Sequence, residues 1–387
     1  RERGATAGVY GVNLLLAGML LLAALGPVAP GREAATQPEQ RVLYAAATDE
    51  LLFEQVGPAG RGKLVIELPW AGTTREVAAY YADGVWRARW DVAALPVWTE
   101  IRYTWQIAPE QGEVLWSPGV TARPDPASTA REWRHTPGDL VDVYTTGYNA
   151  DAATQIAAAA DAGYRRARER LGDLAYQTAA RPRVVVVQSE LAYMMLTDRG
   201  GAGYADSAHG VTLQWRGGYT LDELCAITIP HELFHLVDPT AARPDVPAWF
   251  TEGLAVQNEV GFAWAEAKLQ EARRSRVWIP GEWMAEYPRA DMDEILWYAQ
   301  AWSMVERLSA DQVDGLLAAL VLRGEQFLPA WRVVVGEESE AWMGGYMQAQ
   351  MRRVWPRWVL AGVALAALGC VVAWGRHSRI NGMRGWA

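Results

Sequence analysis

Cysteine and lysine are both scarce in this sequence. Its 387 residues include two cysteines, Cys225 and Cys370, which excludes a disulfide framework and a cysteine-ligated zinc site. Lysine occurs only at Lys63 and Lys268, and 36 basic residues stand against 45 acidic ones, for a net charge of −9. A nucleic-acid partner therefore has no global electrostatic support, and we predict none.

The composition excludes a disordered or collagen-like chain. Hydrophobic residues make up 51% of the sequence and charged residues 21%, which is typical of a chain that folds around a core. The length suits one large domain or two ordinary ones with additional segments.

Long apolar runs occur near both ends of the sequence. Residues 9–29 contain no charged side chain and follow Arg1 and Arg3, which predicts a signal-anchor or a cleaved signal peptide. Residues 358–374 form a second apolar run between tryptophans and predict a transmembrane helix, the alternative being a buried core helix. Two anchors would place the protein at the cell membrane, in contact with lipid, with its middle part extracytoplasmic.

Residues 41–125 show the period-two pattern of β-strands. Apolar and polar side chains alternate cleanly over residues 85–90 and 101–107, and glycine, proline and aspartate turns separate further short runs. Several short alternating strands at this spacing predict a small immunoglobulin-like β-sandwich. Pro124 and Pro126 mark its end.

The next segment, residues 130–353, mixes strands and helices. Residues 152–177 have the pattern of an amphipathic helix, and residues 184–187 form a continuous β-branched run that indicates a buried strand. Residues 210–215 predict another strand, whose edge could align an extended peptide. The glycine-rich loop at residues 200–203 lacks the helix and the lysine that a phosphate site needs.

Residues 231–235 read His-Glu-Leu-Phe-His within a helical stretch. Side chains four positions apart share one face of a helix, so His231 and His235 can reach one metal ion. Glu232 then points towards a water held on that metal. Pro230, directly before the motif, removes one helical hydrogen bond, so we expect the helix to begin or bend there, after a separate segment around Cys225.

Two imidazoles need a third ligand to make a catalytic zinc site with one open position. Glu252 lies 17 positions after His235, and the prolines between them predict that one helix ends and the chain reverses. Glu252 would then face the histidine pair from an antiparallel helix. Gly253 would let those two helices approach closely.

Together, the motifs HELFH (231–235) and WFTEGLA (249–255) resemble the gluzincin metallopeptidases, specifically the bacterial peptidase MA-like family. The resemblance covers about residues 139–353 and implies a thermolysin-like zinc peptidase domain behind the β-sandwich. It implies that one Zn²⁺ ion is bound by three ligands, which are His231, His235 and Glu252. It also implies that Glu232 is the general base.

A further resemblance involves residues 296–303, which are similar to the helix after the zinc site in this family. It implies that Tyr298 hydrogen-bonds the developing oxyanion. The alternative is that Tyr298 is one aromatic of a packed helical face. We expect Cys225 to be a small buried residue and His209 to have a surface or packing role.

The predicted fold class is therefore α+β, with a thermolysin-like peptidase domain, an immunoglobulin-like β-sandwich before it, and a transmembrane helix at each end. The predicted segments are 9–29, 41–125, 130–353 and 358–374. We expect a membrane-anchored zinc metallopeptidase that hydrolyses peptides or proteins, with its catalytic domain extracytoplasmic. The alternative is a membrane-anchored binding or scaffolding protein with a non-catalytic zinc site, although a structural zinc site has no need of Glu232. Substrate preference and oligomeric state are not predicted.

Overall fold

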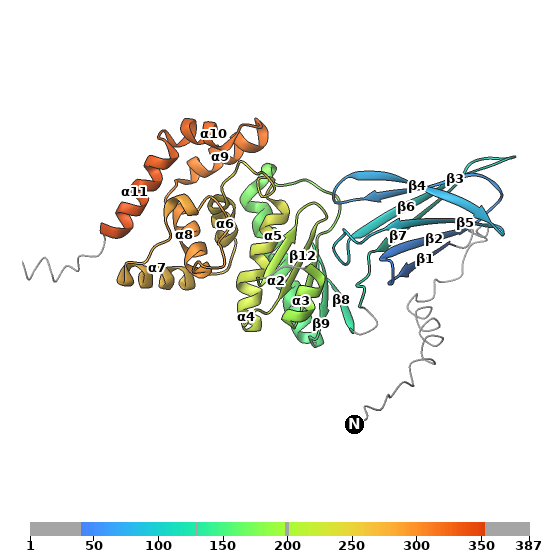
Figure 1. Cartoon of the computed structure of the whole chain (residues 1–387), viewed down its shortest axis with the longest axis horizontal. Helices are drawn as coiled ribbons and strands as arrows, with labels where there is room; N and C mark the ends of the chain where they lie inside the picture. The colour runs from blue at the N-terminus through green and yellow to red at the C-terminus, as the bar shows by residue number, and fades with distance from the viewer. Residues whose placement is uncertain (1–39, 128–130, 198–200, 353–387) are drawn as a thin grey trace, which may run out of the picture. The chain divides into compact units, whose positions relative to one another are not determined.

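The computed structural model describes residues 40–127, 131–197 and 201–352 (Figure 1). Strands dominate the first part of this range and helices the last part, so the described chain is α+β. No helix within these ranges is long and apolar enough to span a bilayer. This finding corrects the predicted fold class, which placed a transmembrane helix at each end. Both predicted membrane segments, 9–29 and 358–374, lie outside the described residues.

The first sheet contains seven strands in the order β1-β2-β5-β4-β3-β6-β7. Its strands are β1 (Gln40–Ala45), β2 (Glu50–Val56), β3 (Gly60–Leu68), β4 (Thr73–Ala82), β5 (Val85–Asp91), β6 (Glu100–Pro109) and β7 (Leu115–Ala122). The long strand β4 pairs with β3 through its first half and with β5 through its second half. The structure therefore has one continuous sheet where the sequence predicted the two separate sheets of a sandwich.

The two halves of this sheet enclose a core of their own. Phe53 of β2 contacts Tyr103 of β6, with ring centroids 5.0 Å apart, so the halves face each other. Alternate residues of β2, β3, β5 and β6 line the interior, as the period-two pattern requires. The strand orders β1-β2-β5-β4 and β3-β6-β7 are those of the two sheets of an immunoglobulin domain.

The second sheet has five strands in the order β11-β12-β10-β9-β8. Its strands are β8 (Trp133–Pro137), β9 (Asp142–Thr146), β10 (Arg183–Val187), β11 (Gly203–Asp206) and β12 (Val211–Trp215). The β-branched strand β10 lies in the centre, parallel to β9 and β12 and buried. Residues 210–215 were predicted to offer an edge, but β12 has neighbours on both sides. The edge next to β12 is β11, which pairs only with β12 among the described strands.

Helices make up most of the remainder. They are α2 (Ala150–Leu171), α3 (Glu190–Thr197), α4 (Leu221–Glu223), α5 (Ile229–Val237), α6 (Ala248–Gln257), α7 (Ala263–Ser275), α8 (Glu294–Val305), α9 (Ala310–Leu322), α10 (Phe327–Val335) and α11 (Ser339–Arg352). Short 3₁₀ turns occur at Gly172–Leu174 and Gly281–Trp283, and a π-helical turn at Leu224–Thr228.

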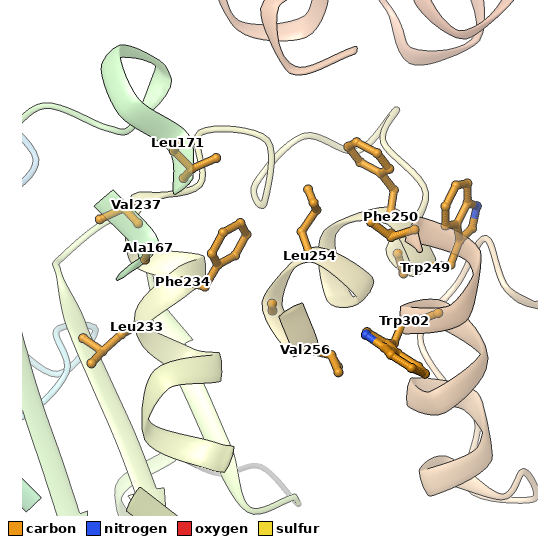
Figure 2. Close-up of a cluster of buried hydrophobic side chains, with 14 of the residues drawn as sticks. Ala167, Leu171, Leu233, Phe234, Val237, Trp249, Phe250, Leu254, Val256 and Trp302 are labelled. Carbon is orange, nitrogen blue, oxygen red and sulfur yellow. The ribbon is translucent and has the colours of Figure 1, made fainter. Parts of the chain in front are cut away.

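Helix α5 packs between α2 and α6, and α6 packs against α8. Figure 2 shows the buried side chains that join these helices: Phe234 of α5 lies near Leu171 of α2, and Trp302 of α8 lies beside Val256 of α6. Phe234 and Val256 are completely buried. Because burying such side chains contributes about 1.5–3 kcal/mol each, this core fixes α5 and α6 relative to each other.

Candidate metal centre

Three side chains from α5 and α6 converge at one point. One ligand atom each of His231, His235 and Glu252 can be chosen so that all lie within 4.8 Å of one another. A carboxylate oxygen of Glu252 lies 3.0 Å from Nε2 of His231 and 3.3 Å from Nε2 of His235. The structure thus brings together the three predicted ligands, and this buried group could hold a metal ion.

Helix α5 is continuous with the chain before Pro230. The π-helical turn Leu224–Thr228 runs directly into α5, and Pro230 occupies its first turn, where a missing N–H is tolerated. The α-helix therefore begins at Ile229, next to Pro230, as expected, but the residues around Cys225 are not a separate segment, because their π-helical turn leads directly into it. Extra π-type turns of this kind occur often at functional sites.

Helix α6 is held close to both of its neighbours. A Cβ on Gly253 would lie 2.5 Å from the carbonyl oxygen of Ala301 in α8. The sequence had suggested that this glycine permits close approach of α6 to α5, but it permits close approach of α6 to α8. The side-chain amide of Asn258 donates to the carbonyl of Pro230 at 2.6 Å. This bond joins the end of α6 to the start of α5 and so positions Glu252 opposite the histidines.

A second carboxylate, Glu259, supports the site and was missed by the sequence analysis. Its Oε1 lies 3.0 Å from Nδ1 of His231, and its Oε2 accepts a hydrogen bond of 2.9 Å from the indole of Trp264. A carboxylate on Nδ1 fixes the imidazole tautomer that leaves Nε2 free for a metal. Glu259 stands seven positions after Glu252, but α6 ends at Gln257, so helical periodicity could not have assigned it.

Glu232 faces the cleft beside the two histidines. Strand β11 crosses it closely, since a Cβ on Gly203 would lie 2.3 Å from Oε1 of Glu232. The glycine-rich loop that showed no phosphate-site pattern therefore leads into a strand that only glycine allows to lie against this carboxylate. Burial raises the pKa of Glu232, partly offset by the neighbouring histidines.

Two tyrosines line the cleft near the ligands. The ring of Tyr298 on α8 packs edge-on against His231, with centroids 5.7 Å apart. Tyr287, which no sequence pattern singled out, also lies near Glu252, whose negative charge acts on its phenol. Burial and the nearby carboxylates raise the pKa of both phenols, so both remain proton donors at neutral pH. Tyr298 thus faces the ligands, while its neighbour Trp297 is fully buried in the core.

Burial and neighbouring charges shift the pKa values of the ligands in opposite directions. Burial by itself lowers the pKa of His231, but hydrogen bonds with Glu252 and Glu259 raise it well above its ordinary value. Burial by itself raises the pKa of Glu252, but the two histidines outweigh it and lower that pKa. The ligand carboxylate therefore stays ionised, and a cation must displace protons from the imidazoles to bind.

The cleft over this centre has a volume of about 800 Å³, enough for several residues of a peptide or a small molecule. Six glutamates line it, and neither lysine nor arginine does so among the described residues. They are Glu190, Glu223, Glu232, Glu252, Glu259 and Glu294. The cleft therefore favours cationic over anionic ligands.

The donor set fits a transition-metal ion. Two imidazole nitrogens and one carboxylate oxygen are the protein ligands of catalytic zinc sites such as that of thermolysin. The oriented imidazole of His231 supplies the support that such ligands need. The ligands also line the cleft, so a bound ion would keep a position open towards it.

Other residues considered from the sequence lie apart from this chemistry. His209 hydrogen-bonds Asp206 in the turn after β11, in agreement with a packing role. Cys225 is half-buried, and burial raises the pKa of its thiol to about 11, which keeps it protonated and unreactive.

Comparison with known proteins found no relative of this chain among protein-family models or curated proteins.

Proposed function

We propose that the chain is a zinc-dependent metallopeptidase of the gluzincin type, with His231, His235 and Glu252 as the ligands of one Zn²⁺ ion. The observation that carries this proposal is the convergence of the three ligand atoms within 4.8 Å. It occurs in an open cleft that also contains a carboxylate not needed for binding the metal, Glu232. A purely structural site would not require that carboxylate or the open cleft.

When bound, zinc supplies a Lewis acid that polarises the scissile carbonyl and lowers the pKa of a water molecule. Glu232 acts as the general base that takes a proton from the attacking water. The same carboxyl group then donates that proton to the amine of the leaving peptide. The raised pKa of Glu232 suits this exchange, because a general base is most effective when its pKa is near the working pH.

The phenols of Tyr298 and Tyr287 are placed to donate hydrogen bonds to the oxyanion that forms at the attacked carbonyl. Both line the cleft on the side of the ligands, and both remain protonated because their pKa values are raised. Donors directed at developing charge are worth about 2.7–4 kcal/mol of transition-state stabilisation. Tyr298, packed against His231, is the more rigidly held of the two, since Tyr287 is 58% exposed.

Strand β11 is suited to align the substrate. Its outer edge has no strand partner among the described residues, and Gly203, Tyr204 and Ala205 line the cleft. An extended peptide could pair with this edge by β-augmentation. The scissile bond would then lie next to Glu232, which is the side chain nearest Gly203.

The proposal is tested by zinc content and hydrolysis measured together. The purified protein should bind about one zinc per chain and hydrolyse unfolded casein, and a zinc chelator should abolish the hydrolysis. Glu232→Gln should keep its zinc and lose at least ~10²-fold in rate. A protein that binds zinc but hydrolyses casein no faster than Glu232→Gln would contradict the proposal.

A further inference from the structure

The turn between β3 and β4 of the seven-stranded sheet inserts a tryptophan beneath the β11–β12 hairpin. The indole N–H of Trp70 donates to the carbonyl of Ser207 at 2.8 Å. The side chain is 4% exposed and belongs to the same buried cluster as the helices around the metal centre. The hydroxyl of Tyr176 in turn donates to the carbonyl of Trp70 at 2.9 Å, so the tryptophan is held by both its side chain and its backbone.

The hairpin is shaped to receive this ring. Gly210 has φ +70°, and a Cβ there would lie 2.1 Å from the Trp70 ring, so no other residue fits the turn without displacing the indole. Other contacts fasten the same two regions. Arg183 pairs with Glu100 at 2.8 Å, and Val97 is buried against β10 and β12.

Strand β11 is a short strand at the edge of its sheet. It is four residues long and hydrogen-bonds to one strand of the described chain, and short edge strands open more readily than central ones. Yet its first residue, Gly203, lies against Glu232, and Ser207, just after its last residue, lines the cleft. A displacement at Ser207 is therefore transmitted along a very short strand to the general base.

We propose that Trp70 is a positioning residue, through which the seven-stranded sheet holds β11 in the place where it borders the cleft and aligns the substrate. The described strands of that sheet carry no group of catalytic side chains, so the sheet would act in the reaction only through this contact. Its kinetic consequence rests on the proposed function. Its structural consequence, the ordering of β11, does not.

The test compares two conservative variants of buried tryptophans. Trp70→Phe keeps an aromatic ring but removes the donor to Ser207. Trp86→Phe is the matched control, because Trp86 is equally buried and donates to Pro58 at 3.0 Å within the core of the seven-stranded sheet. Amide hydrogen exchange over residues 201–208, zinc content and the kinetic constants for casein-derived peptides are measured on the full chain.

In Trp70→Phe, the β11 amide hydrogens should exchange at least ~10-fold faster than in the wild type. The variant should also have a kcat/KM that is ~10–10²-fold lower, with zinc content unchanged. Trp86→Phe should change neither quantity. Unaltered β11 exchange in Trp70→Phe, or an equal effect in Trp86→Phe, would overturn the inference. If the wild-type chain binds zinc without hydrolysing peptides, the proposed function fails, and the exchange comparison still decides the role of Trp70.

Discussion

Nδ1 of His231 lies 3.0 Å from the carboxylate of Glu259, on the opposite side of the ring from Glu252. The imidazole is thus held between two carboxylates, one that would share the metal with it and one that orients it. Because Trp264 also donates to Glu259, the orienting carboxylate is itself fixed. This arrangement makes Glu259 the residue outside the ligand set on which metal affinity should depend most.

Glu259→Gln should lower zinc affinity by about 10–100-fold, the usual cost of losing a carboxylate behind a histidine ligand. Competition with a chromophoric chelator would measure it. Glu266→Gln, an exposed glutamate on α7, is the control and should bind zinc as the wild type does. Equal affinity in the two variants would show that Glu259 has no orienting role.

Glu252→Gln should behave differently from Glu232→Gln. A neutral amide is a poorer zinc ligand than a carboxylate, so Glu252→Gln should lose zinc on dialysis and recover part of its activity when zinc is added. Glu232→Gln should retain zinc and not recover. Zinc analysis before and after dialysis, paired with peptide hydrolysis, distinguishes the two, and loss of zinc from Glu232→Gln would contradict its assignment as base.

Zinc affinity should rise with pH from about pH 6 to about pH 8. The pKa of His231 is raised well above its ordinary value and that of His235 is also raised, so zinc must displace protons from the imidazoles over a wider pH range than at ordinary histidines. The affinity should level off only once the pH exceeds both values. Calorimetry in buffers of different ionisation enthalpy should show release of about one proton or more per zinc at neutral pH. If zinc binding released no proton, the assignment of His231 and His235 as ligands paired with carboxylates would be contradicted.

Gly203→Ala should impair catalysis without removing zinc. The added methyl group would lie 2.3 Å from the Glu232 carboxylate, so either β11 or Glu232 must move. We expect kcat/KM to fall by ~10²-fold, the scale of a displacement of about 1 Å at a reacting centre. Gly344→Ala is the control, because its Cβ meets nothing within 4 Å. Wild-type kinetics in Gly203→Ala would mean that Glu232 is not the base.

Peptides with lysine or arginine near the scissile bond should be hydrolysed faster than matched peptides with glutamate. The six carboxylates of the cleft outnumber the two charges of a divalent ion, so the cleft attracts cations even when the metal is bound. Glu294 lies at an exposed position of the cleft rim. The variant Glu294→Gln should reduce the difference in hydrolysis rate between the two classes of peptide. Exposed Glu282, outside the cleft, supplies the control variant Glu282→Gln. Equal rates for both peptide classes would refute the preference.

The candidate metal centre could be predicted from the sequence because most of its parts lie close together in the chain. The four-residue spacing of His231 and His235 places them on one helical face, and the chain reversal before Glu252 predicted a helix that returns to them. Period-two alternation likewise identified β5 and β6 of the first sheet, and the β-branched run at 184–187 identified the central strand of the second.

Tertiary packing decided which distant residues and strands become neighbours, and sequence periodicity contains no information about that. Glu259 reaches His231 only because α6 ends and the chain turns back, and Trp70 reaches Ser207 across 137 positions of sequence. Which strand forms an edge depends on pairing order, so β11, rather than β12, is the edge strand beside the cleft. Alternation predicts that a segment is a strand, and helical spacing predicts which side chains share a face. Neither specifies the neighbour, because neighbours are set by how the buried surfaces of distant elements fit together.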